Sequence, residues 1–510
     1  MIGKFPRIFS NHWKKCPKVF QSLENSVSDC FMANDKVVKG AGFGWLVFSV
    51  ALANFMAKLD SYIVNISLPT IAQAFHIGTS TVSLVILSYM LTVTSTLLLF
   101  GKLCERRGAK QIFIGGYIVF VLGSLMCGLA SNIFLLVGAR ALQGLGGAML
   151  MTTALPLLTE HVSERHQGAA MGILATAAAL GLSIGAPLGG FITRFLSWHW
   201  IFLINVPVGI LAIVVGLRMI PESARPLRRS RNRFDVPGAL LSLAGLAALV
   251  FSLSMGREKG WTSPLILSGF AAGILLLYIL IRWELRHPDP LLNMKLLRDL
   301  PFAFAVLSGC AVFLLVSGNT FLAPFYLELY QGLAPDRSGL VLVTFAVVLM
   351  IVSPLAGKLA DRMAPHILCS FALLLSAALC VAFSAMLQDR SLTPMLVFLA
   401  GFGGALGFFV SPNNKAVMTL APRRFQSVAS GFYQTMTGMS QILGVCLFET
   451  IFSDSFPSKI VQTSLAGLKP ETLAQGFRHS YVFGAFVCLL GFLFAYIARP
   501  GPAAARLQER

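Results

Sequence analysis

The sequence predicts an all-α integral membrane protein with 14 transmembrane helices, in which a central two-helix insertion joins two pseudo-symmetric six-helix halves. Three observations lead to this fold class. Hydrophobic residues make up 56% of the 510 residues and charged residues only 12%, about half the roughly 25% of soluble domains. Apolar stretches recur along most of the chain, and a short polar motif occurs twice, once after Phe100 and again after Ala356.

The composition excludes several classes of protein. So few charges cannot cover several water-soluble surfaces, so we expect neither long disordered tracts nor a cytosolic enzyme. The net charge of +19 would indicate nucleic-acid binding in a soluble chain, but here it reflects membrane orientation, and we expect no nucleic-acid partner. The nine cysteines contain no Cys-x-x-Cys pair and the eight histidines are scattered, so neither a disulfide scaffold nor a metal site is predicted.

The apolar stretches define the predicted spans. A helix needs about 20 apolar residues to cross the hydrocarbon core. Fourteen stretches meet this length, at residues 43–68, 80–100, 111–130, 133–158, 168–192, 199–219, 236–255, 264–282, 302–327, 338–357, 367–387, 392–413, 427–452 and 480–498.

The basic residues orient these spans. An even number of spans puts both termini on one side, and the segments on that side carry 30 of the 40 Lys and Arg residues, against 8 on the other side. The positive-inside rule then places both termini in the cytoplasm. The two remaining basic residues, Lys58 and Arg140, lie inside predicted spans.

The chain contains an internal duplication. Residues 101–110 read Gly-Lys-Leu-Cys-Glu-Arg-Arg-Gly-Ala-Lys, and residues 357–366 read Gly-Lys-Leu-Ala-Asp-Arg-Met-Ala-Pro-His. Each half then has six spans in parallel orientation, an arrangement that puts a transporter's substrate site between the halves near mid-membrane. We expect a basic tail, a first half, linkers with the inserted hairpin, a second half and a second tail, at residues 1–42, 43–219, 220–300, 301–498 and 499–510.

Several motifs resemble those of the major facilitator superfamily. The two copies of Gly-Lys-Leu-x-Glu/Asp-Arg are similar to its motif A, and residues 140–144, Arg-Ala-Leu-Gln-Gly, are similar to motif B. Fourteen spans, together with residues 59–69 and 198–209, resemble the drug:proton antiporter branch. The fifth span resembles antiporter motif C in Gly172, Gly181, Gly185, Pro187, Gly189 and Gly190.

This resemblance implies a function. It implies a proton-coupled antiporter that exports lipophilic or amphiphilic small molecules by alternating access, as in multidrug efflux. It also implies that motif A forms charge contacts that hold one conformation closed, although the same residues would serve as a topology signal alone. The motif A positions are Gly101, Glu105, Arg106, Gly108, Gly357, Asp361 and Arg362.

Asp60 and Lys58 are charged residues within the first span. A carboxylate is costly there, so it normally faces a cavity or a partner. We expect Asp60 to carry the coupled proton; the alternatives are a helix cap or permanent pairing with a base. Lys58 lies two residues before Asp60, which places the two side chains about 200° apart around the helix. Lys58 therefore points away from Asp60. Lys58 either contacts carbonyls or water, or pairs with a carboxylate such as Glu449, and would disfavour cationic substrates.

Arg140 and Glu449 are the other charges well inside spans. Arg140 keeps its charge at any relevant pH, so it either contacts and tunes a carboxylate during proton transfer, as the resemblance implies, or ties down loop carbonyls. Glu449 takes part in coupling or substrate recognition, or else locks helices together.

The glycines of the fifth span allow close helix packing. We expect Gly172, Gly181 and Gly185 to form a seam against a helix of the other half, with Pro187 bending the helix. The seam either seals the pathway when the transporter changes state or is static.

The energy source follows from missing motifs. Leu follows Gly-Lys at both motif A copies, so no phosphate-binding Gly-x-x-x-x-Gly-Lys-Ser/Thr loop exists, and no catalytic constellation indicates an enzyme. We expect no cofactor, with the proton gradient as energy source. The expected partners are protons, membrane lipids and an amphiphilic substrate. The chain would act in the bacterial inner membrane as a monomer or with an outer-membrane efflux partner through an adaptor.

Two other functions remain open. One is export of a specific endogenous metabolite, siderophore or lipid precursor, with Lys58 recognising an anionic group. The other is a non-transporting membrane receptor. The 40 phenylalanines suit a pliable apolar cavity.

Overall fold

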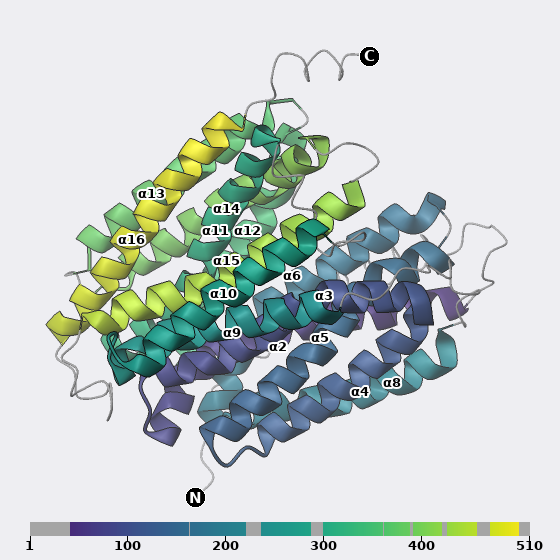
Figure 1. Cartoon of the computed structure of the whole chain (residues 1–510), viewed down its shortest axis with the longest axis horizontal. Coiled ribbons are helices and arrows are strands. Elements are labelled where there is room, and N and C mark those ends of the chain that lie inside the picture. The colour runs from purple at the N-terminus through teal and green to yellow at the C-terminus, as the bar shows by residue number, and fades with distance from the viewer. Residues whose placement is uncertain are drawn as a thin grey trace, which may run out of the picture.

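The computed structural model of the chain is a bundle of long helices (Figure 1). Every regular element in the described part is helical, which confirms the all-α class. The predicted tails fall almost wholly outside the described residues, as do most of the linker residues on either side of the inserted hairpin. The structure describes residues 41–162, 164–220, 236–286, 299–360, 362–387, 391–420, 426–455 and 470–498.

The first predicted half forms seven helices, of which the last two together make the sixth span. They are α2 (Ala41–Phe75), α3 (Thr79–Arg107), α4 (Ala109–Gly128), α5 (Ile133–His161), α6 (Glu164–Phe195), α7 (Trp200–Leu203) and α8 (Asn205–Met219).

The inserted hairpin and the second half follow. The hairpin consists of α9 (Val236–Lys259) and α10 (Pro264–Arg286). The second half contains α11 (Leu300–Phe325), which continues into the π-helical turn η3 (Tyr326–Tyr330), and then α12 (Pro335–Ala360), α13 (Pro365–Ala385), α14 (Thr393–Leu420), α15 (Gln426–Asp454) and α16 (Pro470–Ile497).

Each of the fourteen predicted stretches falls on one of these helices, on the pair α7 and α8 or on α11 with η3, although several of the predicted ends lie one or two residues outside the helix. In the described part of the chain, thirteen helical segments are long and apolar enough to cross a membrane, with α7 and α8 counted together as Trp200–Met219. The remaining stretch is in α9, whose apolar segment Leu240–Gly256 is shorter. The chain is therefore a multi-pass membrane protein.

Tight turns bring consecutive helices together. Gly108 joins α3 to α4 with a φ of 90°, a backbone conformation that side chains rarely allow. The Asn132 side chain caps α5 by accepting a hydrogen bond from the Leu135 backbone N–H at 2.8 Å. These short connections keep α3, α4 and α5 together in one half, where α5 packs against both α3 and α4.

The two halves repeat the same packing. In the first half α2 packs on α6, α3 and α4 on α5, and α4 on α8; in the second half α11 packs on α15, α12 and α13 on α14, and α13 on α16. These pairs correspond one to one under the internal duplication. The packing therefore shows the pseudo-symmetry that the repeated motifs predict.

The halves meet along two equivalent seams. One seam joins α6 to α12 and the other joins α3 to α15. The hairpin covers the second seam, because α9 contacts both α3 and α15 while α10 packs mainly on α9 (Figure 1). We call the end of the bundle that holds Phe75, Thr79, Pro335 and Asp454 the distal end, and the end that holds Arg107 and Ala360 the proximal end.

Candidate functional site

A buried ion pair lies inside the first half. Asp60 of α2 and Arg140 of α5 are 0% and 1% exposed, and Arg140 Nη1 lies 2.6 Å from Asp60 Oδ2. Removing two charges from water costs several kcal/mol per ion unless their remaining hydrogen-bonding groups are also satisfied. Asp60 and Arg140, which were singled out separately from the sequence, are therefore partners in one ion pair.

Neutral side chains complete this ion pair. The Gln143 and Asn205 amides donate hydrogen bonds to Asp60 Oδ1 at 2.8 and 3.1 Å. Arg140 donates from Nη1 to Gln143 Oε1 at 2.6 Å and from Nε to the Val85 carbonyl at 3.1 Å. The Asp60 carboxylate therefore accepts hydrogen bonds from three side chains of α5 and α8, so both of its oxygens have partners.

Tyr89 lies between this ion pair and a cavity. Its ring centroid is 4.3 Å from the Arg140 guanidinium carbon, a distance at which a cation is attracted to an aromatic face. Tyr89 also lines the cavity. A single aromatic side chain therefore contacts both the buried ion pair and the space between the halves.

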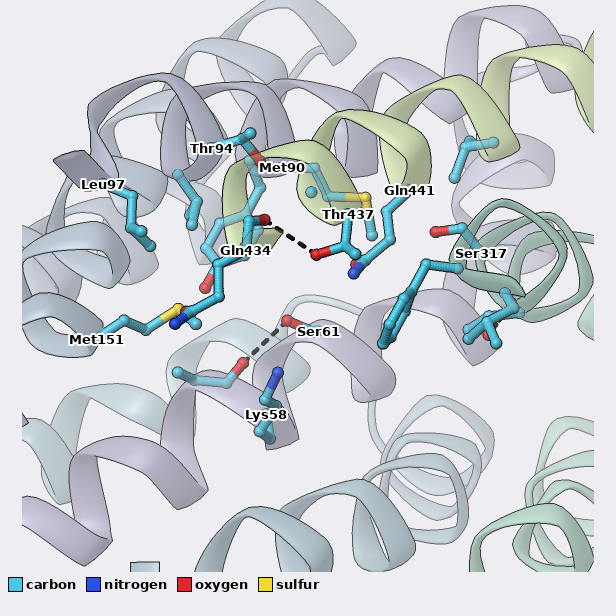
Figure 2. Close-up of a pocket in the computed structure, with 18 of the residues that line it drawn as sticks. Lys58, Ser61, Met90, Thr94, Leu97, Met151, Ser317, Gln434, Thr437 and Gln441 are labelled. Carbon is cyan, nitrogen blue, oxygen red and sulfur yellow. Dashed lines mark hydrogen bonds between the residues drawn. The ribbon is translucent and has the colours of Figure 1, made fainter. Parts of the chain in front are cut away.

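The cavity has a volume of about 330 Å³ and is lined by α2, α3 and α5 of the first half and by α11 and α15 of the second. Figure 2 shows α2 and α15 facing each other across it. Amide and hydroxyl side chains alternate with aliphatic and methionine side chains in its lining. Because both halves contribute, any change in their relative position alters the cavity.

Lys58 and Asp60 point to opposite sides of α2, as their spacing predicts. Lys58 lines the cavity (Figure 2), whereas Asp60 faces α5 and α8. The pairing of Lys58 with Glu449, one of the alternatives for Lys58, is not formed between these two described residues. Glu449 instead accepts hydrogen bonds from hydroxyls of α3.

Glu449 joins the two halves near the distal end. It lies in α15, is 1% exposed, and its Oε1 accepts hydrogen bonds from the hydroxyls of Thr79 at 3.0 Å and Ser80 at 2.7 Å. Both donors belong to the first turn of α3, where the positive end of the helix dipole favours a carboxylate. The contact has the geometry of the lock between helices that was one of the two expectations for Glu449.

The glycines of α6 mostly pack within their own half, which corrects the expected seam for Gly181 and Gly185. A Cβ at Gly181 would lie 2.6 Å from the Phe55 carbonyl of α2, and one at Gly185 would lie 2.8 Å from Tyr62 Cβ. Their spacing of four residues puts them on one helix face. The helix α2 packs along that face of α6. The surroundings of Gly172 lie outside the described residues.

Gly189 and Gly190 face different helices at the distal end of α6. A Cβ at Gly189 would meet Ile63 and Ile66 of α2, whereas a Cβ at Gly190 would clash with the Pro335 carbonyl of α12. Among the motif glycines whose surroundings the structure describes, Gly190 is therefore the one that faces the other half. Pro187, three residues earlier, lies within the unbroken helix α6, close enough to α12 that a Cβ at Gly339 would lie 3.0 Å from the Pro187 backbone.

The motif A glycines lie where α3 and α12 end. Gly101 and Gly357 are half-buried in the last turns of these helices, and Gly108 forms the turn to α4. Arg362 is exposed. The side chains of Glu105 and Arg106, and residue Asp361, lie outside the described residues, so the expected charge contacts at this end stay a prediction.

Three site residues were not singled out from the sequence. Gln143 lies within residues 140–144 and Asn205 within residues 198–209, which are two of the family-like motifs. Tyr89 lies in the second predicted span. Gln143 follows Arg140 by three residues, which places both on one helix face, and a buried amide beside a buried arginine is the signal that would have found it. Tyr89 carries no such signal, because aromatic residues are common in membrane helices.

Aromatic residues gather away from the cavity. A cluster in the second half contains Tyr326, Phe398 and Tyr481 around Phe383, whose ring centroid lies 4.7 Å from that of Tyr481. Phe313 is the one phenylalanine among the described lining residues of the cavity. The phenylalanines are therefore not concentrated at this cavity, and many of those that the structure describes are buried in the helix bundle. Among the described residues, no three His, Cys, Asp or Glu side chains are grouped to hold a metal ion.

Comparison with known proteins identifies the family. The model of the Major Facilitator Superfamily matches residues 50–445 and 305–510. The chain is 31% identical to the riboflavin transporter RibZ of Clostridioides difficile, over 88% of this chain and 96% of that protein. It is 30% identical to the putative multidrug resistance protein MdtD of Escherichia coli O157:H7, over 89% and 94%, and 31% identical to the multidrug resistance protein Stp of Mycobacterium tuberculosis, over 80% and 75%.

A solved structure shares the fold. The crystal structure of a bacterial homolog of the human lysosomal transporter Spinster, inward-facing and unoccupied, matches with a TM-score of 0.64 at 14% identity. The match covers 91% of this chain and all of that one. Family model, relatives and fold agree, and no catalytic family is indicated: the chain belongs to the major facilitator superfamily of membrane transporters.

Proposed function

We propose that the chain is a proton-coupled antiporter that exports amphiphilic small molecules by alternating access. The orientation that its basic residues favour puts the proximal end and both termini in the cytoplasm of a bacterial inner membrane. The proton gradient supplies the energy, and no cofactor takes part. Protons, lipids and the substrate are the partners of this cycle, with the chain acting alone or delivering substrate to an outer-membrane partner through an adaptor.

One observation carries this proposal: a fully buried carboxylate lies one side chain away from a cavity shared by both halves. Asp60 is 0% exposed and paired with Arg140, while Tyr89 contacts the Arg140 guanidinium and lines the cavity. Movement of the Tyr89 ring would open a route between the cavity and the carboxylate. Protonation of Asp60 would then break the ion pair, because a neutral carboxyl no longer attracts the guanidinium.

The closed distal end supports loading from the proximal side. Glu449 is bound to Thr79 and Ser80 across one seam, and Gly190 lies against Pro335 across the other. Along α3 the cavity extends from Tyr89 to Leu97, from near the middle of that helix toward Arg107. With the proximal end in the cytoplasm, this conformation is the one that takes up substrate for export.

The test uses the purified full chain in liposomes with an imposed pH gradient. Addition of an amphiphilic substrate should release protons from the vesicles that contain wild-type protein, as reported by an internal pH dye. Asp60→Asn should abolish this substrate-dependent proton flux because the side chain can no longer exchange a proton.

Asp454→Asn is the matched control, since it removes an exposed carboxylate from the end of α15. This variant should couple like wild type. Equal substrate-dependent proton flux by wild type and Asp60→Asn would refute the assignment of Asp60, and no substrate movement by wild type across a panel of amphiphiles would favour a receptor.

A second candidate is export of one specific metabolite. The cavity presents many hydrogen-bonding groups, among them Asn65, Gln434 and Gln441, which suit a substrate with a fixed pattern of donors and acceptors. The relative RibZ is named as a riboflavin transporter. Transport of a single flat polar compound in preference to all drug-like amphiphiles in the same liposomes would support this candidate over multidrug export.

A further inference from the structure

Four polar side chains that line the cavity have no partner among the described residues. Lys58, Thr94, Ser317 and Gln441 form no hydrogen bond or ion pair with any residue that the structure describes. Figure 2 shows the ammonium of Lys58 directed into the space between α2 and α15. These groups come from both halves, so one bound molecule could satisfy donors on each side.

The charge of the cavity is unbalanced. Lys58 is the one charged residue among the described residues that line it, and that described lining contains no carboxylate. Asp60 is turned away and is neutralised by Arg140 at 2.6 Å. Glu449 lies one turn beyond the lining residue Val445 and accepts from the first turn of α3. Neither acid is therefore placed as a counter-ion for Lys58.

We propose that the cavity selects amphiphilic anions, with a carboxylate or sulfonate of the substrate bound to Lys58 Nζ. An unpaired ammonium within a membrane protein is costly, and an anionic group would offset that cost. A cationic substrate would meet a like charge and no carboxylate in the described lining. This inference rests on the proposed function, because it takes the cavity as the transport site, and it deepens that function by fixing the charge of the substrate.

The rest of the lining fits the other parts of such a molecule. Met90, Met151 and Leu97 offer flexible apolar contacts, which accommodate varied ring systems. Ser317 and Gln441 can bond to substrate groups on the side of the second half. A volume of about 330 Å³ is at the small end of the range for drug-sized ligands, so we expect substrates with two or three fused rings rather than larger molecules.

The experiment compares three probes that share one dansyl scaffold. Dansylglycine carries a carboxylate, dansylamide is neutral, and a dansylamidoethyl-trimethylammonium derivative is a fixed cation. Binding of each probe to the detergent-purified full chain is measured by fluorescence, and export is measured in liposomes. Lys58→Met removes the charge with nearly the same length, and Lys58→Arg keeps the charge.

Wild type should bind and transport dansylglycine at least about tenfold better than the cation, the ratio expected for one charge-assisted contact. Lys58→Met should abolish most of this ratio, and Lys58→Arg should retain most of it. A wild-type preference for the cation or the neutral probe would overturn the proposal, as would an anion preference that Lys58→Met leaves unchanged.

The Asp60→Asn variant separates this inference from the proposed function. It should still prefer the anionic probe, because Asp60 does not line the cavity and its replacement removes no positive charge. If proton coupling proves independent of Asp60 while the anion preference depends on Lys58, the coupling proposal fails and the charge selection stands. If coupling depends on Asp60 but the probes are bound without regard to charge, only the inference about Lys58 fails.

Discussion

Asp60 and Glu449 are both carboxylates buried in the membrane region, yet their surroundings differ in kind. Asp60 is held within one half by the Arg140 guanidinium and two amides. Glu449 is held across the interface between the halves, with the hydroxyls of Thr79 and Ser80 as donors. The first carboxylate is paired with a guanidinium, whereas the second accepts from hydroxyls at a helix N-terminus.

The difference separates two tasks. If the halves rock as the proposed function requires, the partners of Asp60 move with it, so its ion pair would persist through the change and break only on protonation. The contacts of Glu449 with Thr79 and Ser80 must break whenever α15 and α3 separate at the distal end. Under the proposed function, Asp60 would store a proton and Glu449 would hold one conformation. The following variants test this contrast, from the largest expected effect to the smallest.

Arg140→Met should give the largest loss of stability. Truncating one member of a buried ion pair leaves an unpaired charge, at a cost of about 3–5 kcal/mol. The melting temperature of the purified protein in lipid nanodiscs should fall clearly. The double variant Asp60→Asn/Arg140→Met should recover part of that loss, because the lone charge is gone. A double variant that is less stable than the single one would contradict the pairing as the source of stability.

Glu449→Gln should change the conformational equilibrium more than the stability. The amide keeps the shape but lacks the charge, so the hydrogen bonds from Thr79 and Ser80 weaken by about 1–3 kcal/mol in total. Spin labels at His76→Cys and Asp454→Cys, after replacement of the native cysteines, should report a longer distance between the halves at the distal end. An unchanged distance distribution would mean that Glu449 does not hold this end closed.

Gly190→Ala and Gly189→Ala form a matched pair on neighbouring positions. A methyl group at Gly190 would clash with Pro335 of the other half, whereas one at Gly189 would press on Ile63 and Ile66 within the same half. Each substitution should cost about 1–3 kcal/mol through overpacking. Only Gly190→Ala should lengthen the distance between labels at the distal end; the same lengthening in Gly189→Ala would erase the distinction between the two contacts.

Ser80→Ala should have the smallest effect. It removes one hydroxyl donor to Glu449, at a cost of about 0.5–1.5 kcal/mol, and leaves Thr79 in place. The distal distance should shift in the same direction as in Glu449→Gln, by less. A Ser80→Ala change added to Glu449→Gln should have little further effect, since both alter one contact.

The fold could be predicted from the sequence because its signal is local. Hydropathy along the chain marks each span, and the repeated Gly-Lys-Leu motif aligns the halves without any knowledge of packing. The α9 segment is the one where the criterion of length and hydropathy falls short. The site was predicted in part: Asp60, Arg140, Lys58 and Glu449 stand out because charge within a span is costly.

The partners of these residues could not be predicted in the same way. Asp60 and Arg140 are 80 residues apart, and Gln143 and Asn205 join them only because α2, α5 and α8 are rotated to face one another. The packing of the same half turned Gly181 and Gly185 toward α2 rather than toward the other half. Spacing along a helix fixes which side chains share a face, but not which helix lies opposite that face.

The sequence by itself therefore determined the all-helical membrane class, the duplication of the halves and the identity of the costly buried charges, since each depends on composition and spacing along the chain. The tertiary structure decided which charges neutralise one another and which face the cavity. Asp60 pairs with Arg140, Glu449 binds the start of α3, and Lys58 faces the cavity with no ion-pair partner among the described residues. The physical reason is that pairing depends on distances between helices, which only packing of the whole bundle sets.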